Sequence, residues 1–339
     1  MKLDFKHAYG CLAGVAIGDA MGMPVEFLSG DEIENIYGWV DRFVESPSEH
    51  PHSRFAPGST GDDTGQTIAI LHAYNDLGCL TRQSAAAELL RWEASVAEDD
   101  LAVIIGPSTR RSLQNLRLGM DPSGSGLQGV TNGAAMRAAP VGLANPGDPE
   151  RACIEAVEAS YPTHAAKPAI AGAAAVACAV SEALNPDSSL ESILKAARWG
   201  AEQGRKFGRW SWATPLEGRI ELAEQIVRDY ADPRQAMRFI CRYVGVDSIV
   251  SESVAAAFGI VLLAKGDPAQ AVILGANIGG DTDTIAAIAG AVCGAWRGID
   301  AVDPALLAQV EAVNHLNLDQ EAQRMVAIAN VKSKQGTGE

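Results

Sequence analysis

Hydrophobic residues recur at helical spacing along most of the chain. In the first segment Phe5, Ala8, Leu12 and Val15 lie on one face, since residues three or four apart share a helix face. We expect this first helix to end at the break from Gly18 to Pro24. Similar patterns predict helices from Asp62 to Gly78, from Thr81 to Val96, after Gly106, after Asn132, after His164, between 188 and 243, from Ser251, from Asp281 to Arg297, and from near Asp303 and near Asp319.

Interruptions of this pattern are short and evenly spread. The long exception is 38–60, which contains Pro47, Pro51 and Pro57 and is predicted to be a surface loop with a functional use. No internal repeat of fixed period is evident. We therefore expect one all-α domain over residues 1–331 and a disordered polar tail over 332–339.

Composition supports a helical fold with a large core. The chain has 339 residues, of which 47% are hydrophobic and only 6% aromatic, and alanine and glycine are abundant. Small side chains favour closely packed helices over sheets of branched and aromatic residues. The formal net charge of −15 argues against a nucleic-acid surface, which needs clustered Lys and Arg. A small anionic ligand is compatible with this charge, because helix N-termini and bound cations supply local positive potential.

The cysteines and the chain ends favour a soluble cytoplasmic protein. The six cysteines are scattered singly in apolar contexts, which is typical of buried, reduced thiols. The start, Met-Lys-Leu-Asp, does not resemble a signal peptide. The longest apolar stretch, 169–180, is too short to cross a bilayer, so no membrane association is expected. The sequence gives no indication of oligomeric state.

The strongest chemical signal is ANIGGDTDTIAA at 276–287. Asp281 and Asp283 alternate with threonines at the start of an apolar helix, where two like charges need backbone N–H groups or a cation. Asp62 and Asp63 form a similar start, GDDT, earlier in the chain. Asp and Thr are also preferred helix caps, and for either motif alone a cap is the better interpretation. Two such starts together favour a shared metal site.

The ligand types indicate which metal would bind. Carboxylates, hydroxyls and water suit hard cations, so Mg²⁺, Mn²⁺ or Ca²⁺ is favoured over zinc. Four aspartates suit two adjacent ions, which can polarise a substrate oxygen and lower the pKa of a shared water molecule.

Five motifs together resemble the ADP-ribosylglycohydrolase family, which includes dinitrogenase-reductase-activating glycohydrolase. They are GCLAGVAIGDAMGMPVEF at 10–27, GDDTGQTIA at 61–69, TNGAAMR at 131–137, PTH at 162–164 and ANIGGDTDTIAAIAGAVCGAWRG at 276–298. Their order and separation cover most of the chain. The resemblance implies a compact, orthogonal multi-helix domain with a binuclear Mg²⁺ or Mn²⁺ centre. It also implies hydrolysis of the bond between ribose C1″ of an ADP-ribosyl group and its acceptor, whether a small molecule or a modified protein.

Site residues follow from the resemblance by position. Glu26 matches the family's base or water-orienting glutamate, and Asp62 and Asp283 would join it as catalytic residues. The metal ligands would be Asp62, Asp63, Asp281, Asp283 and Thr284, and the substrate would contact Ser108, Asn132, Gly133, Met136, His164, Gly279 and Gly280. Gly279 and Gly280 would let backbone amides approach the ligand. By position alone, Glu26 could equally be a surface carboxylate and His164 a capping or core histidine.

Two departures from the family pattern bear on activity. Gly61 stands where relatives carry a Thr or Ser ligand, so one ion loses a ligand that Thr60 or water would replace. Val103 to Ile105 stand where several relatives carry an acid, so the leaving group would differ from arginine. Alternative hypotheses are a small-molecule N-riboside hydrolase, a non-catalytic ADP-ribose binder and, less favoured, an isoprenoid-type diphosphate enzyme. The pair Trp210 and Trp212 would form either a stacking wall or a loop packed on the core.

Overall fold

The computed structural model describes residues 1–336, and these contain helices and no strand. The first helices are α1 (Phe5–Gly22), η1 (Met23–Val25), α2 (Gly30–Tyr37), α3 (Asp62–His72), α4 (Arg82–Ser95), α5 (Glu98–Ile104), α6 (Pro107–Arg117), α7 (Pro122–Ser125), α8 (Gly133–Met136) and α9 (Ala139–Leu143). They are followed by α10 (Pro149–Ser160), α11 (Lys167–Ala183), α12 (Leu190–Gly204), α13 (Leu216–Asp229), α14 (Pro233–Tyr243), α15 (Val250–Leu263), α16 (Pro268–Ala276), α17 (Thr282–Arg297), η2 (Ile299–Ala301), α18 (Pro304–Asn314) and α19 (Leu318–Gly336). The all-α prediction is confirmed.

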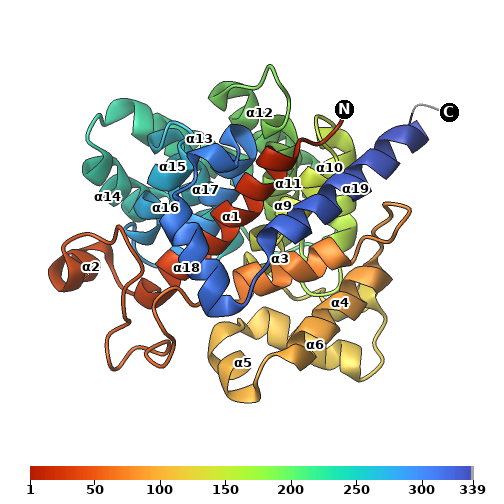
Figure 1. Cartoon of the computed structure of the whole chain (residues 1–339), viewed down its shortest axis with the longest axis horizontal. Coiled ribbons are helices and arrows are strands. Elements are labelled where there is room, and N and C mark those ends of the chain that lie inside the picture. The colour runs from red at the N-terminus through yellow and green to blue at the C-terminus, as the bar shows by residue number, and fades with distance from the viewer. Residues whose placement is uncertain (337–339) are drawn as a thin grey trace.

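The centre of the fold is the pair α1 and α17, which run side by side (Figure 1). Gly10, Gly14, Gly18 and Gly22 of α1 repeat every four residues and all meet the backbone of α17 or of the turn that follows it. A Cβ atom on Gly14 would lie 2.1 Å from the carbonyl oxygen of Gly290. Side chains larger than hydrogen would therefore push these two helices apart.

This contact explains where the first helix ends. We expected it to end at the break from Gly18 to Pro24; α1 continues through the first glycine of that break to Gly22, and η1 carries the chain on to Val25. Glycine lowers helix propensity, yet here its missing side chain permits the contact with α17. The helix expected from Asp62 to Gly78 ends earlier, at His72.

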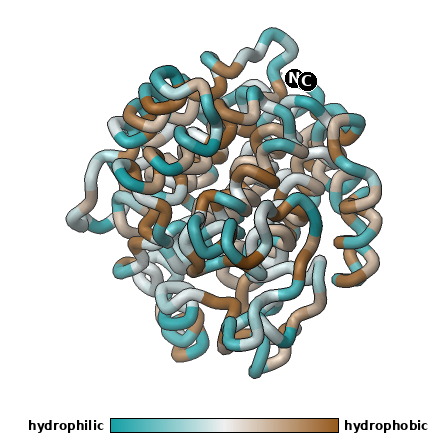
Figure 2. Tube along the Cα trace, turned by 90° about the vertical axis from the view of Figure 1, so that its left-hand side faces the viewer, coloured by the Kyte–Doolittle hydropathy of each residue, from teal (hydrophilic) through white to brown (hydrophobic). Residues whose placement is uncertain are grey.

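Other helices surround the central pair. α11 and α15 contribute long buried faces, and α16 packs against both α1 and α17. Along the outer helices hydrophobic and hydrophilic positions alternate (Figure 2), as expected of helices with one face on the core. The stretch Phe5–Val25 is long and apolar enough to cross a membrane, but 94% of its most apolar window is buried inside the fold. It is the core helix of this domain.

The C-terminal helix differs from the expected tail. α19 runs to Gly336, and Lys332 is buried with its ammonium group bonded to Glu155. A buried ion pair fixes this end of the helix to α10. Residues 337–339, the rest of the expected tail, lie outside the described residues.

The cysteines and tryptophans also resolve earlier alternatives. All six cysteines are free; Cys79 and Cys241 are exposed, which corrects the expectation that all are buried. Trp210 and Trp212 are 59% and 87% exposed, with their rings 4.7 Å apart edge to face. These two side chains therefore do not pack on the core.

We predict that Gly14→Ala destabilises the protein by about 1–3 kcal/mol, because the added methyl group overpacks the contact with Gly290. Urea unfolding followed by circular dichroism would measure the change. Gly218→Ala is the matched control, because Gly218 is an exposed position of α13 and a Cβ there meets no atom within 4 Å. This change should stabilise the protein by up to about 1 kcal/mol. Equal stability of wild type and Gly14→Ala would contradict the packing account.

Candidate metal centre

Three helix ends meet at one buried cluster of carboxylates. α3 and α17 contribute their N-termini, and α1 contributes its C-terminal half. Asp19, Asp63 and Asp283 each offer an oxygen within 4.8 Å of the others, and so do Glu26, Asp281 and Asp283. The two groups share Asp283, which gives the cluster two adjacent centres.

The predicted aspartates are held by specific donors. Gln66 Nε2 donates to Asp62 Oδ2 at 2.6 Å, and the Thr284 amide donates to Asp283 Oδ1 at 2.9 Å. Thr284 Oγ1 also donates to Asp63 Oδ2 at 3.4 Å. Asp63 Oδ1, by contrast, is buried without a hydrogen-bond partner. A buried carboxylate oxygen without a hydrogen-bond donor is typical of an oxygen that coordinates a cation.

Asp19 is the acidic residue that sequence reasoning missed. It is fully buried in α1; its Oδ1 accepts from the Gly61 amide at 2.7 Å, and its Oδ2 accepts from the amide and hydroxyl of Thr64 at 2.9 and 2.6 Å. Asp19 thus caps α3 from another helix, in place of a side chain at Gly61. The available signal was a charged residue inside an otherwise apolar helix.

The absence of a side chain at position 61 has a steric explanation. A Cβ atom on Gly61 would lie 3.1 Å from Asp19 Oδ1, so the capping carboxylate occupies the space that a side chain would need. Thr60, the candidate substitute ligand, instead donates its amide and hydroxyl to Asn314 Oδ1 at 2.9 and 3.3 Å. Thr60 therefore does not replace the missing hydroxyl at the cluster.

Glu26 follows η1 and reaches the cluster from the α1 side. Its side chain is 14% exposed, with Oε2 3.6 Å from His52 Nδ1, and its backbone oxygen accepts a hydrogen bond from His50 Nε2 at 2.6 Å. The next residue, Phe27, has φ +65°, a region that costs energy for a non-glycine residue. The Phe27 amide donates to the Gly280 oxygen at 2.8 Å. This hydrogen bond holds the backbone at Phe27 against the segment that precedes α17.

Burial dominates the electrostatics of the cluster. Removal from water raises the pKa values of Glu26, Asp62, Asp63 and Asp281 well above their usual range, and repulsion from Asp283 raises them further. Burial also raises the pKa of Asp19 to about 7, against the opposing hydrogen bonds from Thr64 and Gly61. A divalent cation would reverse these shifts by favouring the charged carboxylates.

The residues present fit a hard divalent cation. All candidate ligand atoms are oxygens, and one of them, Asp63 Oδ1, is buried without a hydrogen-bond donor. The carboxylates lie close together and receive few hydrogen bonds from the protein, as expected of ligands to a hard cation. The donor set suits Mg²⁺ or Mn²⁺ and contains no cysteine or histidine ligand. Acidic groups of this chain could therefore bind metal.

Comparison with known proteins decides the family. Residues 2–336 match the ADP-ribosylglycohydrolase family model. The chain belongs to the ADP-ribosylglycohydrolase family. It is 36% identical to the uncharacterized protein YegU of Escherichia coli K12, over 92% of this chain and 94% of YegU. It is 28% identical to the ADP-ribosylarginine hydrolase Tri1 of Pseudomonas putida GB-1, over 91% and 76% of the two chains.

A solved structure supports the same fold. An ADP-ribosylglycohydrolase-related protein complex contains a chain that superposes with a TM-score of 0.68 at 22% identity, covering 96% of this chain and 98% of that one. The fold of the ADP-ribosylglycohydrolase family is therefore confirmed. At this identity the likeness concerns the fold alone.

Several residues expected to contact substrate are buried close to one another. A Cβ atom on Gly133 would lie 2.5 Å from His164 Cε1 and 3.3 Å from Thr109 Oγ1, so this glycine brings α8, α6 and His164 together. Ser108 is buried in the first turn of α6, next to Thr109, and Met136 is buried in α8. Which of these residues contacts substrate stays a prediction.

Asn132 and the glycine pair have different contacts from those expected. Asn132 Nδ2 donates to Asp281 Oδ2 and to Ser253 Oγ, so its amide orients a candidate metal ligand. Gly279 and Gly280 have φ values of +89° and +74° and press against the backbone of Gly30 and Val246. The Gly280 amide donates to the Leu28 oxygen at 2.8 Å, so this amide is already engaged within the protein. Whether either glycine contacts substrate stays a prediction.

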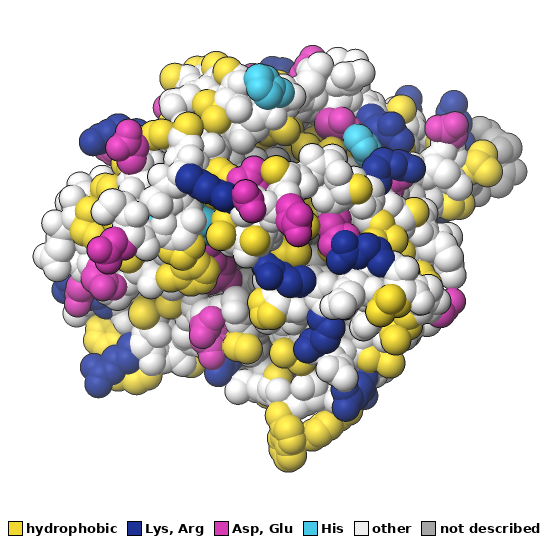
Figure 3. Space-filling model, turned by 90° about the horizontal axis from the view of Figure 1, so that it is seen from below, with side chains coloured by type: hydrophobic (Ala, Val, Ile, Leu, Met, Phe, Trp, Pro, Cys, Tyr) yellow, Lys and Arg dark blue, Asp and Glu magenta, His cyan; other side chains and the backbone are white. Residues whose placement is uncertain are grey.

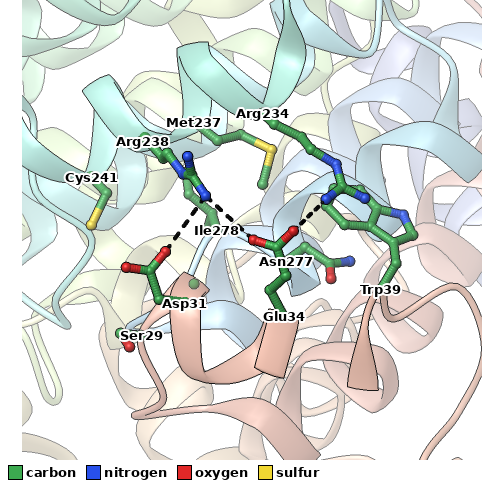
Figure 4. A pocket seen from close by; sticks show the side chains of 11 residues that line it. Ser29, Asp31, Glu34, Trp39, Arg234, Met237, Arg238, Cys241, Asn277 and Ile278 are labelled. Atoms are coloured by element: carbon green, nitrogen blue, oxygen red, sulfur yellow. Dashed lines mark hydrogen bonds and ion pairs between the residues drawn. The ribbon is translucent and has the colours of Figure 1, made fainter. Parts of the chain in front are cut away.

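A separate cavity of about 460 Å³ lies between α2 and α14 (Figure 4). Arg234 and Arg238 reach across it to Glu34 at 2.7 and 3.3 Å, and Arg238 also approaches Asp31 at 3.7 Å. None of the clustered carboxylates lines it. On the face seen in Figure 3, acidic and basic side chains are interspersed, without a large patch of one sign.

We predict that the metal-free protein loses stability as pH rises from about 4 to about 7. The folded state holds a proton on Asp19, whose pKa rises from 3.8 to about 7, whereas the unfolded chain releases it near 3.8. Adding Mg²⁺ or Mn²⁺ at pH 7.5, at one hundred times its Kd, should restore about 2.7 kcal/mol.

Thermal unfolding in EDTA and in metal, at pH 5 and pH 7.5, would measure both effects. Asp283→Ala is the control, because it removes the carboxylate shared by both centres. A metal-induced rise in Tm of the same size in wild type and in this variant would contradict the proposed location.

Proposed function

We propose that the chain is a metal-dependent hydrolase that cleaves the bond between ribose C1″ of an ADP-ribosyl group and an N- or O-linked acceptor. The observation that carries this proposal is the sharing of Asp283 by two carboxylate groups, one of which includes Glu26. Membership of the ADP-ribosylglycohydrolase family supports the substrate class. The name of the relative Tri1 supports it as well.

Asp62, Asp63, Asp281, Asp283 and Thr284 would hold two ions, and Asp19 adds a carboxylate to one centre. When bound, Mg²⁺ or Mn²⁺ supplies positive charge that polarises the ribose diol and lowers the pKa of a water molecule. Asn132 and Gln66 orient the ligand carboxylates Asp281 and Asp62 by donating to one oxygen of each. Asp281 belongs to one of the two carboxylate groups, whereas Asp62 belongs to neither.

Glu26 is suited to move a proton. A water oxygen attacks C1″, the bond to the acceptor breaks, and its electron pair leaves with the acceptor atom. Glu26 accepts the proton that the water releases, and a proton from Glu26 or from solvent neutralises the acceptor. Burial and the neighbouring carboxylates raise the pKa of Glu26, and bound cations would lower it again, so that Glu26 is ionised and can accept this proton.

The preferred leaving group is inferred from the acidic residues at and near positions 103–105. Val103 to Ile105 supply no carboxylate, and the nearby Asp100 is 2.7 Å from Arg54. Because residues 103–105 carry no acid that would hold a cationic arginine acceptor, we favour a neutral acceptor. Comparing turnover of ADP-ribosyl-arginine, an O-linked ADP-ribosyl-serine peptide and a plain nucleoside distinguishes these substrate classes.

We predict that Glu26→Gln lowers kcat on the best ADP-ribosyl substrate by about 10²–10⁴-fold, since the amide cannot accept the water's proton. Metal affinity should change far less. Asp283→Ala should abolish both turnover and metal binding. Steady-state assays with Mg²⁺ or Mn²⁺, together with calorimetry, would separate the two effects.

Glu34→Gln is the matched control, because the same chemical change falls in the neighbouring cavity and should leave kcat near the wild-type value. Turnover that persists in EDTA, or in Asp283→Ala, would rule out a metal-dependent reaction at this cluster.

A further inference from the structure

Arg137 is the largest fully buried side chain described, with 1% of its surface exposed, and it directly follows α8. Its guanidinium donates through Nη1 to Gln66 Oε1 and through Nη2 to Thr163 Oγ1. An arginine has donors and no acceptor, so both neighbouring atoms must accept. That requirement fixes the direction of two hydrogen-bond chains.

The first chain leads to a metal ligand. Because the Gln66 atom beside Arg137 must be the oxygen, the other end of the amide is Nε2 and can only donate. It donates to Asp62 Oδ2 at 2.6 Å. By way of Gln66, Arg137 thus fixes the position of one oxygen of Asp62.

The second chain leads to His164. Thr163 Oγ1 accepts from Arg137 and has one proton of its own to donate. Within residues 1–336, its other partner is His164 Nδ1 at 2.8 Å, and both side chains are fully buried. If His164 Nδ1 carried the proton, the buried Thr163 hydroxyl would have no acceptor, which is costly. His164 Nδ1 is therefore the acceptor.

The protonation of the remaining ring nitrogen follows from this. Burial and the charges of Arg137 and Arg111 hold the pKa of His164 well below its usual range, so the ring is neutral at pH 7. With Nδ1 unprotonated, the proton is on Nε2, which donates to Thr131 Oγ1 at 2.9 Å. Within the described chain Thr131 Oγ1 has no other partner, and the residue is partly exposed. Its own proton is free to donate outward.

We propose that Arg137 is a positioning residue that orients Asp62 through Gln66 and fixes the Nε2–H tautomer of His164 through Thr163, so that the Thr131 hydroxyl donates to an oxygen of the substrate. Thr131 precedes Asn132, whose amide holds Asp281, so this donor lies at the edge of the carboxylate cluster. The acceptor would be a ribose or diphosphate oxygen. Only this last step rests on the proposed function.

The tautomer is tested without any activity assay. Nitrogen-15 NMR of labelled protein distinguishes Nδ1–H from Nε2–H, and the spectrum of His164→Asn assigns the signal. We expect the Nε2–H form in wild type and in Thr163→Ser, which keeps the hydroxyl. Thr163→Val should populate the Nδ1–H form, since its side chain cannot donate. An Nδ1–H signal in folded wild type would overturn the proposal, even if Thr163→Val does not fold.

The substrate contact is tested by binding. In calorimetry with ADP-ribose and Mg²⁺, Thr131→Val should weaken ADP-ribose binding by about tenfold, the effect of losing about 1.4 kcal/mol. Mg²⁺ affinity should be unchanged, and Thr131→Ser should bind as wild type. Equal ADP-ribose affinity in Thr131→Val, or no ADP-ribose binding by wild type, would overturn the Thr131 contact. Binding without turnover would contradict the proposed hydrolase and leave this inference intact.

Discussion

The site depends on the direct contact between the backbones of α1 and α17. Glycines at every fourth position of α1 allow it, and the last of them, Gly22, lies against the backbone of Asp283. Thr282 Oγ1 donates to the Gly22 oxygen at 2.9 Å, which fixes the start of α17 to the end of α1. Glu26, four residues further along, is thereby delivered to the same place as Asp283. Packing of the smallest residues thus determines where the most highly charged ones meet.

This packing creates an electrostatic cost that neighbouring groups reduce only in part. Helix N-termini favour negative charge, and amide donors from Asn132 and Gln66 satisfy one oxygen each. Repulsion among the remaining carboxylates still raises their pKa values. The fold therefore stabilises the arrangement of the ligands without neutralising them. A site of this kind gains stability when a cation binds, and the same ion can then act on a substrate oxygen.

The sequence predicted the helical fold and the meeting of the two aspartate motifs, because each motif follows a glycine and opens an apolar helix. It did not predict the ends of α1 and α3, since the glycines of α1 are explained only by a partner some 260 residues away. Asp19 and Arg137 were missed for a related reason. A single charged residue within an apolar segment carries no spacing signal, and its role depends on donors and acceptors that α3 and the turn before α11 supply.

The burial of Arg137 bears on how many ions the centre holds. Glu26, Asp62, Asp63, Asp281 and Asp283 bring five negative charges when ionised, and Arg137 is the cation acting on Asp62. Two divalent ions and this guanidinium would cancel those five charges, whereas one ion would leave two uncompensated in a medium of low dielectric constant. If the cluster binds metal as proposed, this charge balance suits two ions even without a hydroxyl at position 61. In the doubly loaded state Asp19 is the remaining acid, and its three hydrogen bonds are the means by which α3 accommodates its charge.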